Sequence, residues 1–157
     1  MIQESIKPQG YVTAQIEYKD GRKETIEFKN TILRMGREAL ARTLANDVGD
    51  GFLLYVNRML FGDGGTAGGA IKYVDTTRNG LFGISRASKS VIAQVDPNMS
   101  SQVVFTSVLS FNDANGYALN EMALQLATGD LYSMVTFLDL NKTDQMQITW
   151  NWRISFV

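Results

Sequence analysis

The stretch that decides the fold is Met146-Gln-Ile-Thr-Trp-Asn-Trp-Arg-Ile-Ser-Phe156. Large apolar side chains occupy every second position in it, and polar side chains occupy the positions between them. Side chains of a β-strand point alternately to opposite faces, so this period of two predicts a strand with one buried face. A strand of this length spans roughly 35 Å, which is long for a globular protein and favours a central place in a sheet.

Other segments of the chain repeat this alternation. Tyr11–Tyr18 and Lys23–Lys29 flank Asp20-Gly21, a dipeptide that favours tight hairpin turns. Further alternating or apolar segments are separated by turn residues, and we expect strands over 52–61, 90–96, 101–111, 120–127 and 131–140. With the last segment, this gives seven or eight strands. The sequence therefore predicts an all-β-dominated fold, an antiparallel β-sandwich.

One segment has the period of a helix instead. Between residues 33 and 46 the apolar side chains recur near one stripe, at Leu33, Leu40, Ala41 and Leu44. Asn30 or Thr31 can cap the beginning of the helix, and Gly49 follows its end. We expect this one short α-helix, about residues 33–46, to pack at the end of the sandwich or across one sheet.

The length of 157 residues suits one domain, here 1–157, with an N-terminal arm and a long irregular loop at 62–89. This loop begins with Gly62-Asp-Gly-Gly-Thr-Ala-Gly-Gly69. A phosphate-binding loop would end in Gly-Lys-Ser/Thr and open a helix, and a dinucleotide site would need a βαβ unit, so neither pattern fits. A glycine turn after a strand is the simpler interpretation. Glycines also allow a loop to lie close against the backbone of another subunit.

Composition narrows the functional classes. The chain has no histidine and no cysteine, so it lacks the usual general base near neutral pH and the usual nitrogen and sulfur metal ligands. A carboxylate-dependent hydrolase stays the least favoured alternative, since no acid pair stands out. The net charge of −1 gives no long-range attraction toward nucleic acid or an anionic membrane, and no apolar run reaches the ~18 residues of a membrane span. We therefore expect no enzymatic activity, no cofactor and no small-molecule substrate.

Three smaller patterns need an interpretation. Asn112-Asp-Ala-Asn-Gly116 resembles half of a calcium loop but lacks the later bidentate glutamate, so a turn is favoured and no metal site is predicted. Glu121 is a candidate for a specific polar contact, with simple solvent exposure as the alternative. Trp150 and Trp152 fall on the apolar face, which favours burial in the core over the stacking of sugars.

Three stretches together resemble a group of small structural proteins of tailed bacteriophages. They are the segment Lys29–Leu44, the segment Met59-Leu-Phe-Gly-Asp-Gly-Gly-Thr66, and a C-terminal set that comprises Leu119–Leu126, Gly129–Leu131, Val135–Phe137, Lys142-Thr143 and Ile148–Phe156. Their order and spacing cover most of the chain. The resemblance implies a β-sandwich virion component of the tail, baseplate or neck, with fibre attachment among the roles open to it, and it transfers no catalytic residues.

The expected partners are therefore copies of the chain itself and other virion proteins, and the expected location is the virion, after synthesis in the host cytoplasm. Two alternatives stay open, a capsid decoration protein and a carbohydrate-binding module that recognises a receptor. The candidate assembly interface is Gly62, Asp63, Gly64, Gly65, Thr66 and Tyr73.

Overall fold

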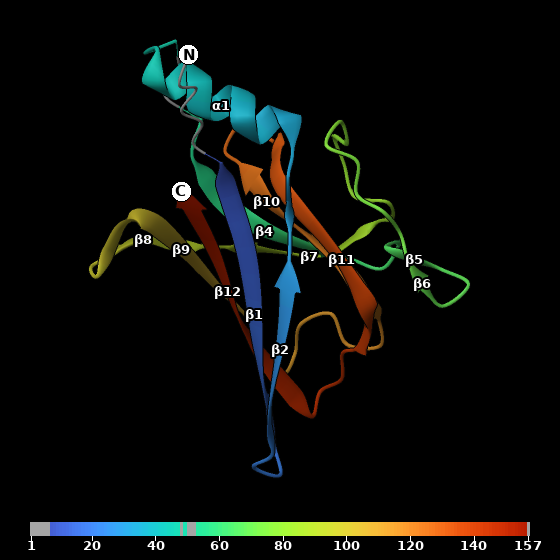
Figure 1. Cartoon of the computed structure of the whole chain (residues 1–157). Helices are drawn as coiled ribbons and strands as arrows, with labels where there is room; N and C mark the ends of the chain where they lie inside the picture. The colour runs from blue at the N-terminus through green and yellow to red at the C-terminus, as the bar shows by residue number, and fades with distance from the viewer. Residues whose placement is uncertain (1–6, 48, 50–52, 157) are drawn as a thin grey trace.

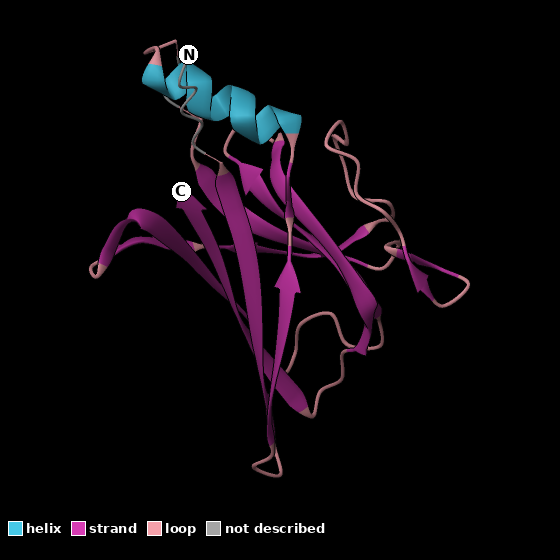
Figure 2. Cartoon of the chain, in the orientation of Figure 1, coloured by secondary structure: helices cyan, strands magenta, loops and turns pink. Residues whose placement is uncertain are grey.

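The computed structural model describes residues 7–47, 49 and 53–156. Two five-stranded antiparallel sheets pack face to face as a β-sandwich, as predicted, and one helix crosses an end of the sandwich (Figures 1 and 2). The strands are β1 Pro8–Tyr18, β2 Lys23–Lys29, β3 Thr31–Ile32, β4 Val56–Gly62, β5 Thr66–Ala67, β6 Ala70–Ile71, β7 Ser85–Ser90, β8 Ile92–Asp96, β9 Met99–Leu109, β10 Ala118–Leu126, β11 Leu131–Asn141 and β12 Met146–Phe156; the helix α1 is Arg34–Leu44.

The first sheet has the order β2-β1-β12-β9-β8, so the strand that decided the fold is its central strand, as predicted. β12 pairs with β1 along its whole length, from Tyr18 opposite Met146 to Pro8 opposite Phe156. The hairpin predicted around Asp20-Gly21 is present, because β1 and β2 pair antiparallel across that turn. Chain segments far apart in sequence thus form the middle of this sheet.

The second sheet has the order β3-β11-β10-β4-β7. Its central strand, β10, is buried on both faces: Met122, Leu124 and Leu126 face the sandwich core, and Glu121 and Ala123 on the other face are also fully buried. The opposite sheet covers only one face of β10, so another part of the chain must bury the second face. The segment that follows β4 provides part of that cover, and it is described below.

The core between the sheets is built around two tryptophans. Trp150 and Trp152 have no exposed surface, and the ring of Trp150 lies 5.2 Å from that of Phe61 and 5.9 Å from that of Phe137. At one margin Phe28 stacks on Phe137 with 4.6 Å between ring centroids, which joins β2 of one sheet to β11 of the other. Burial of the indoles agrees with the prediction and removes them from any surface on which a sugar could stack.

The helix differs from the prediction in its ends and in its buried face. It begins after Leu33 with no side-chain cap, so neither Asn30 nor Thr31 caps it, and it buries Gly36 and Ala39. Leu44 is 89% exposed, which contradicts the expected stripe of leucines. The reason is close packing on β11: a Cβ on Gly36 would lie 2.3 Å from the carbonyl oxygen of Tyr132, so the smallest side chains face the sheet.

Strand number and loop length also differ from the prediction. The two large sheets contain ten strands rather than seven or eight, because β3 is only two residues long and the segment expected as one strand over 90–96 follows a separate strand, β7. Within the loop expected at 62–89, the irregular stretches are 63–65 and 72–84, because β5, β6 and most of β7 lie in that range. The proposed N-terminal arm falls mainly on residues 1–6, which lie outside the described residues.

Candidate functional site

Residues 63–84 form a detour between two neighbouring strands. β4 ends at Gly62, and the chain returns as β7, which pairs with β4 from Ser85 to Ser90. Between them the chain forms the small β5–β6 hairpin and an irregular segment that project to one side of the sandwich (Figure 1). We call residues 63–84 the anchored loop, because two buried side chains of β10 hold it.

The first anchor is Glu121, which is fully buried. Its Oε1 accepts hydrogen bonds from the backbone N–H of Gly64 at 3.0 Å and of Gly83 at 2.8 Å. Its Oε2 accepts one from the backbone N–H of Phe82 at 2.7 Å. A carboxylate offers only acceptors, and here three backbone donors from the two ends of the loop converge on it. Glu121 therefore joins the beginning and the end of the anchored loop.

The second anchor is the neighbouring side chain, Asn120, which is 3% exposed. Its Oδ1 accepts a hydrogen bond from the backbone N–H of Gly65 at 2.7 Å. Its Nδ2 donates to Thr66 Oγ1 at 3.1 Å and to Asp139 Oδ1 at 2.9 Å, and makes a longer contact of 3.3 Å with the carbonyl oxygen of Asp63. The amide thus uses both its donor and its acceptor to hold the first four residues of the loop on β10 and β11.

Glycine is required at three positions at the start of this segment, 62, 64 and 65, because other parts of the chain come close there. A Cβ on Gly65 would lie 2.3 Å from the carbonyl oxygen of Asn120, and one on Gly64 would lie 2.3 Å from the backbone nitrogen of Gly83. A Cβ on Gly62 would lie 2.6 Å from Oε1 of Glu121. The backbone reaches the two anchors only where no side chain intervenes. Packing within the chain therefore explains Gly62, Gly64 and Gly65, whereas Gly68 and Gly69 have open space around them and adopt positive φ angles.

Three large apolar side chains of the anchored loop are exposed. Tyr73 is 82% exposed, Ile84 is 66% exposed and Ile71 is 50% exposed. Farther along the chain Thr136 Oγ1 donates to the carbonyl oxygen of Lys72 at 2.7 Å, which holds the segment that carries Tyr73 against β11. Exposed apolar side chains mark a contact surface when they form a contiguous patch, and the hydrogen bond from Thr136 holds in place the backbone that carries Tyr73.

The six residues predicted as an interface divide into two groups. Gly62 and Gly65 are buried and contact β10, and Asp63, Gly64 and Thr66 are half-buried, with Asp63 in a 2.8 Å ion pair with Arg86. Tyr73 alone of the six is exposed. The run that starts at Gly62 thus supports the loop from within, and the accessible apolar surface lies later in the loop.

The polar contact predicted for Glu121 is present, and simple solvent exposure of this side chain is wrong. The roles of Asn120, Ile71 and Ile84 were missed. One signal was available for Asn120: two adjacent polar residues interrupt an otherwise apolar strand, and a polar side chain at a buried position needs a partner. The sequence held no comparable signal for which loop side chains point outward.

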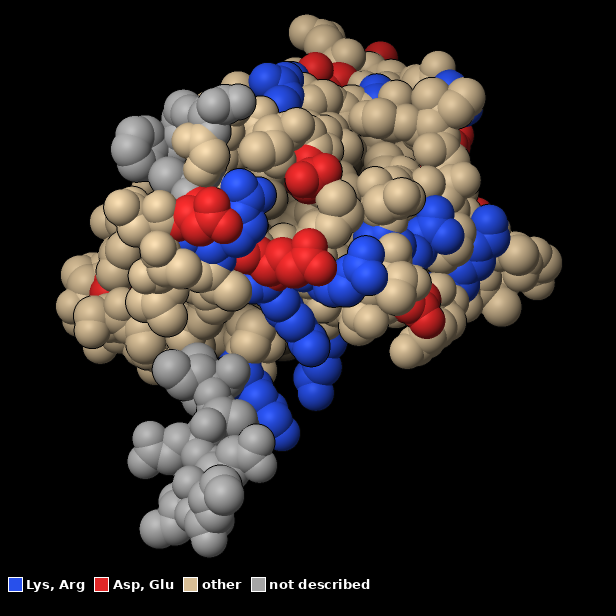
Figure 3. Space-filling model, turned by 90° about the horizontal axis from the view of Figure 1, so that it is seen from above, with Lys and Arg blue, Asp and Glu red and all other residues tan. Residues whose placement is uncertain are grey.

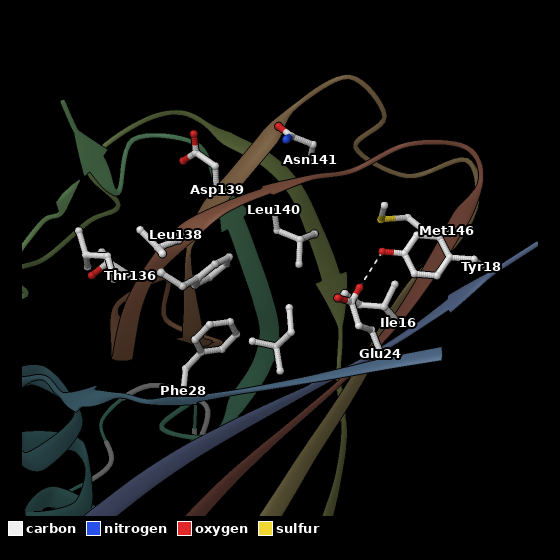
Figure 4. Close-up of a pocket in the computed structure, with 13 residues that line it drawn as sticks. Ile16, Tyr18, Glu24, Phe28, Thr136, Leu138, Asp139, Leu140, Asn141 and Met146 are labelled. Carbon is white, nitrogen blue, oxygen red and sulfur yellow. Dashed lines mark hydrogen bonds between the residues drawn. The ribbon is translucent and has the colours of Figure 1, made fainter. Parts of the chain in front are cut away.

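An apolar hollow of about 570 Å³ lies where the sheets diverge beside the Phe28–Phe137 stack (Figure 4). Aliphatic side chains of β1, β2, β11 and β12 line it. At its rim Tyr18 donates a hydrogen bond to Glu24 Oε2 at 2.8 Å, and this bond raises the pKa of the tyrosine above its ordinary value. Thr136, Asp139 and Asn141 add further polar groups to the lining of this hollow, whose walls are otherwise apolar.

A second hollow, of about 710 Å³, lies near the helix and is lined by polar side chains that include Lys29, Arg37 and Arg153. The three charged side chains of its lining are all basic. Basic and acidic side chains alternate on the face of the molecule viewed from above (Figure 3). This arrangement agrees with the net charge of −1 and gives the face no single sign of charge.

The segment that resembles half of a calcium loop is a turn. Asp113 Oδ2 accepts the backbone N–H of Ser110 at 2.8 Å and forms a 2.6 Å ion pair with Lys89. Across residues 7–47, 49 and 53–156, no group of three acidic side chains is placed to hold a metal ion. The helix in the described part of the chain is too short to cross a membrane.

Comparison with known proteins gives no match: no family, no curated protein and no solved structure is significantly similar to this chain.

Proposed function

We propose that the chain is a non-enzymatic structural protein of a tailed-phage virion, in the tail, baseplate or neck, and that it docks onto neighbouring subunits through the anchored loop. Its partners are copies of itself and other virion proteins. The proposal is supported by the resemblance of the segments Lys29–Leu44, Met59–Thr66 and Ile148–Phe156 to phage structural proteins. The β-sandwich fold is compatible with it.

The observation that carries the proposal is the contrast between the two sides of the anchored loop. Its inner side is fixed by three hydrogen bonds to Glu121 and one from Gly65 to Asn120, while Tyr73 and Ile84 face outward. A segment that is already ordered loses little conformational entropy when it binds. Tyrosine is enriched among the few residues that supply most of the binding energy of protein interfaces, and Tyr73 is such a side chain on this ordered segment.

The test uses a phage whose genome encodes the chain. Mass spectrometry of purified particles is expected to detect the chain, and a null mutant is expected to yield incomplete particles in electron micrographs. Complementation with a Tyr73→Ser, Ile84→Ser double variant should fail. Leu44→Ser is the matched control, because Leu44 is as exposed as these residues but lies on the helix.

Each outcome has a defined meaning. Absence of the chain from purified particles refutes the virion role. Full complementation by the double variant refutes docking through the loop. Localisation on the capsid shell would identify a decoration protein instead, and saccharide binding by the isolated monomer that is lost in Tyr73→Ser would favour receptor recognition.

A further inference from the structure

The strand β8 lies at an edge of the first sheet. It pairs with β9 on one side, from Ile92 opposite Thr106 to Val95 opposite Val103. In the part of the chain that the structure describes, no strand pairs with its other side. The backbone N–H and C=O groups along an unpaired edge offer the hydrogen bonds that another strand would use.

The long edge strands of the sandwich differ in charge. β2 carries Lys23, Glu24, Glu27 and Lys29, and β7 carries Arg86 and Lys89. Charged side chains at a sheet edge discourage pairing with another chain, because pairing would remove them from water. β8 reads Ile92-Ala-Gln-Val-Asp96, and its only charge is at the last position. Of these three longer edge strands, β8 alone lacks this protection over most of its length.

The charge of Asp96 is already used within the hairpin. Its Oδ1 accepts the backbone N–H of Asn98 at 2.8 Å, and its Oδ2 accepts the Nε2 amide of Gln102 at 2.9 Å. Both oxygens therefore fix the turn to β9 and do not guard the edge. Among the described residues, no strand pairs with the outer edge of the uncharged part of β8, from Ile92 to Val95.

Apolar side chains on this hairpin are exposed to an unusual degree. Ile92 is 75% exposed, Val95 is 59% exposed and Met99 is 49% exposed. The β8–β9 hairpin projects away from the body of the sandwich, on the side opposite the anchored loop (Figure 1). An accessible, apolar and uncharged strand edge is the kind of edge that pairs with another strand.

We propose that β8 pairs antiparallel with β8 of a second copy of the chain, so that the first sheets of the two copies form one continuous sheet about a two-fold axis. The axis passes between the two Gln94 residues. In this register Ala93 faces Val95 of the second copy, and Ile92 faces Asp96 of the second copy. The interface is isologous and closes on itself, so it ends at a dimer.

A second copy fits because the strand complements itself. The two Gln94 amides face each other, and each offers both a donor and an acceptor. Like charges do not oppose one another, since the two Asp96 residues lie at opposite ends of the paired strands. On the inner face, an apolar hollow of about 250 Å³ lies next to Ala93 and is lined by Phe105 and Leu54. Val95 of the second copy comes to the edge of this hollow.

The dimer is weak, because a stable interface buries about 800 Å² on each partner and a strand of five residues supplies only part of that area. The inference concerns a different surface from the proposed function and does not rest on it. Since the anchored loop projects on the opposite side, a dimer leaves that loop free for other subunits (Figure 1).

The absence of cysteine from the chain allows a direct test by single-cysteine cross-linking. Residues directly opposite in antiparallel strands have Cβ atoms about 4.5–5.5 Å apart, so a shift of about 1 Å brings them to the separation in a disulfide of about 3.5–4.5 Å. Under mild oxidation Gln94→Cys should form disulfide dimers more than tenfold faster than Thr25→Cys, a control on the exposed and charged edge strand β2. A rate equal to that of the control overturns the proposal.

A mixture tests the register. Ala93→Cys and Val95→Cys should cross-link to each other faster than either does to itself, because these positions face each other only across the proposed axis. Faster self-linking of either variant overturns this register.

Sedimentation equilibrium gives a second test of the dimer. For the unmodified chain, the average molecular mass should rise with protein concentration. Val95→Lys should abolish this rise, and Thr25→Lys should keep it. A rise that is unchanged in Val95→Lys places the contact elsewhere and overturns the proposal.

Discussion

Replacement of Glu121 by glutamine separates the role of its charge from the role of its shape. The two side chains have nearly the same volume, so the core around β10 stays filled. Glutamine, however, presents one acceptor oxygen and one NH₂ donor where the glutamate presents two acceptors. If the oxygen takes the place of Oε1, it keeps the bonds from Gly64 and Gly83. The NH₂ group then meets the backbone N–H of Phe82, which loses its partner.

The expected loss follows from that arrangement. A hydrogen bond to a charged group contributes about 1.5–3 kcal/mol, and a buried donor without a partner adds a desolvation cost of the same order. Water can reach the loop once it loosens and offsets part of this cost. We therefore expect Glu121→Gln to lower the free energy of unfolding by about 2–3 kcal/mol, which is a large share of the total of about 5–15 kcal/mol for a typical domain.

Urea denaturation at neutral pH measures this change, and hydrogen exchange of the amides of Gly64, Phe82 and Gly83 shows whether the loss is local. Exchange at these three amides should accelerate more than exchange in β12. Glu17→Gln is the matched control, because that carboxylate lies on the surface and its loss should change stability by no more than about 0.5 kcal/mol. A Glu121→Gln protein as stable as this control, with unchanged exchange at the three amides, would refute the anchoring role.

Three further predictions concern packing and pH. Gly65→Ala should lower the free energy of unfolding, measured by urea titration, by about 1–3 kcal/mol, because the added Cβ would overlap the carbonyl group of Asn120. Gly80→Ala is the control: the added Cβ would meet open space, and the free energy of unfolding should change by less than about 0.5 kcal/mol. Trp150→Ala should cost about 3–5 kcal/mol by thermal or urea unfolding, since it empties the centre of the core. Burial raises the pKa of the Tyr132 hydroxyl, so above pH ~10 the folded chain keeps a proton that the unfolded chain releases. The free energy of unfolding should therefore fall as pH rises through that range. Denaturation at a series of alkaline pH values should show a steeper fall for the unmodified chain than for Tyr132→Phe.

The parts of the fold that could be predicted from sequence are those in which one face of an element is buried and the other is not. β12 is the clearest case, because its alternation extends over the whole strand and its observed ends match the expected ones. The β1–β2 hairpin was equally predictable from the sequence, since Asp20-Gly21 marks the turn. A period of two carries the information in both cases.

The parts that could not be predicted depend on contacts between distant segments. The leucines of the helix suggested a buried stripe, but the distance between α1 and β11 is set by Gly36, which no local pattern reveals. Similarly, the sequence pattern of the glycines after β4 indicates only a turn or an interface with another subunit. Their close contacts with Glu121 and Asn120 appear only after β10 has been placed next to β4. The periodicity of a segment predicts which face of its helix or strand is buried. It does not predict which other element packs against that face.

The pairing of β1 with β12 has a consequence for biosynthesis. These two strands are separated by more than a hundred residues, and they lie side by side over their whole length. While the ribosome is still translating the middle of the protein, β1 has emerged but the strand that pairs with its inner edge has not yet been made. Contacts between such distant segments make folding slow. The nascent polypeptide therefore spends most of its synthesis with an incomplete sheet, and this is the period when binding by a chaperone would protect it from aggregation.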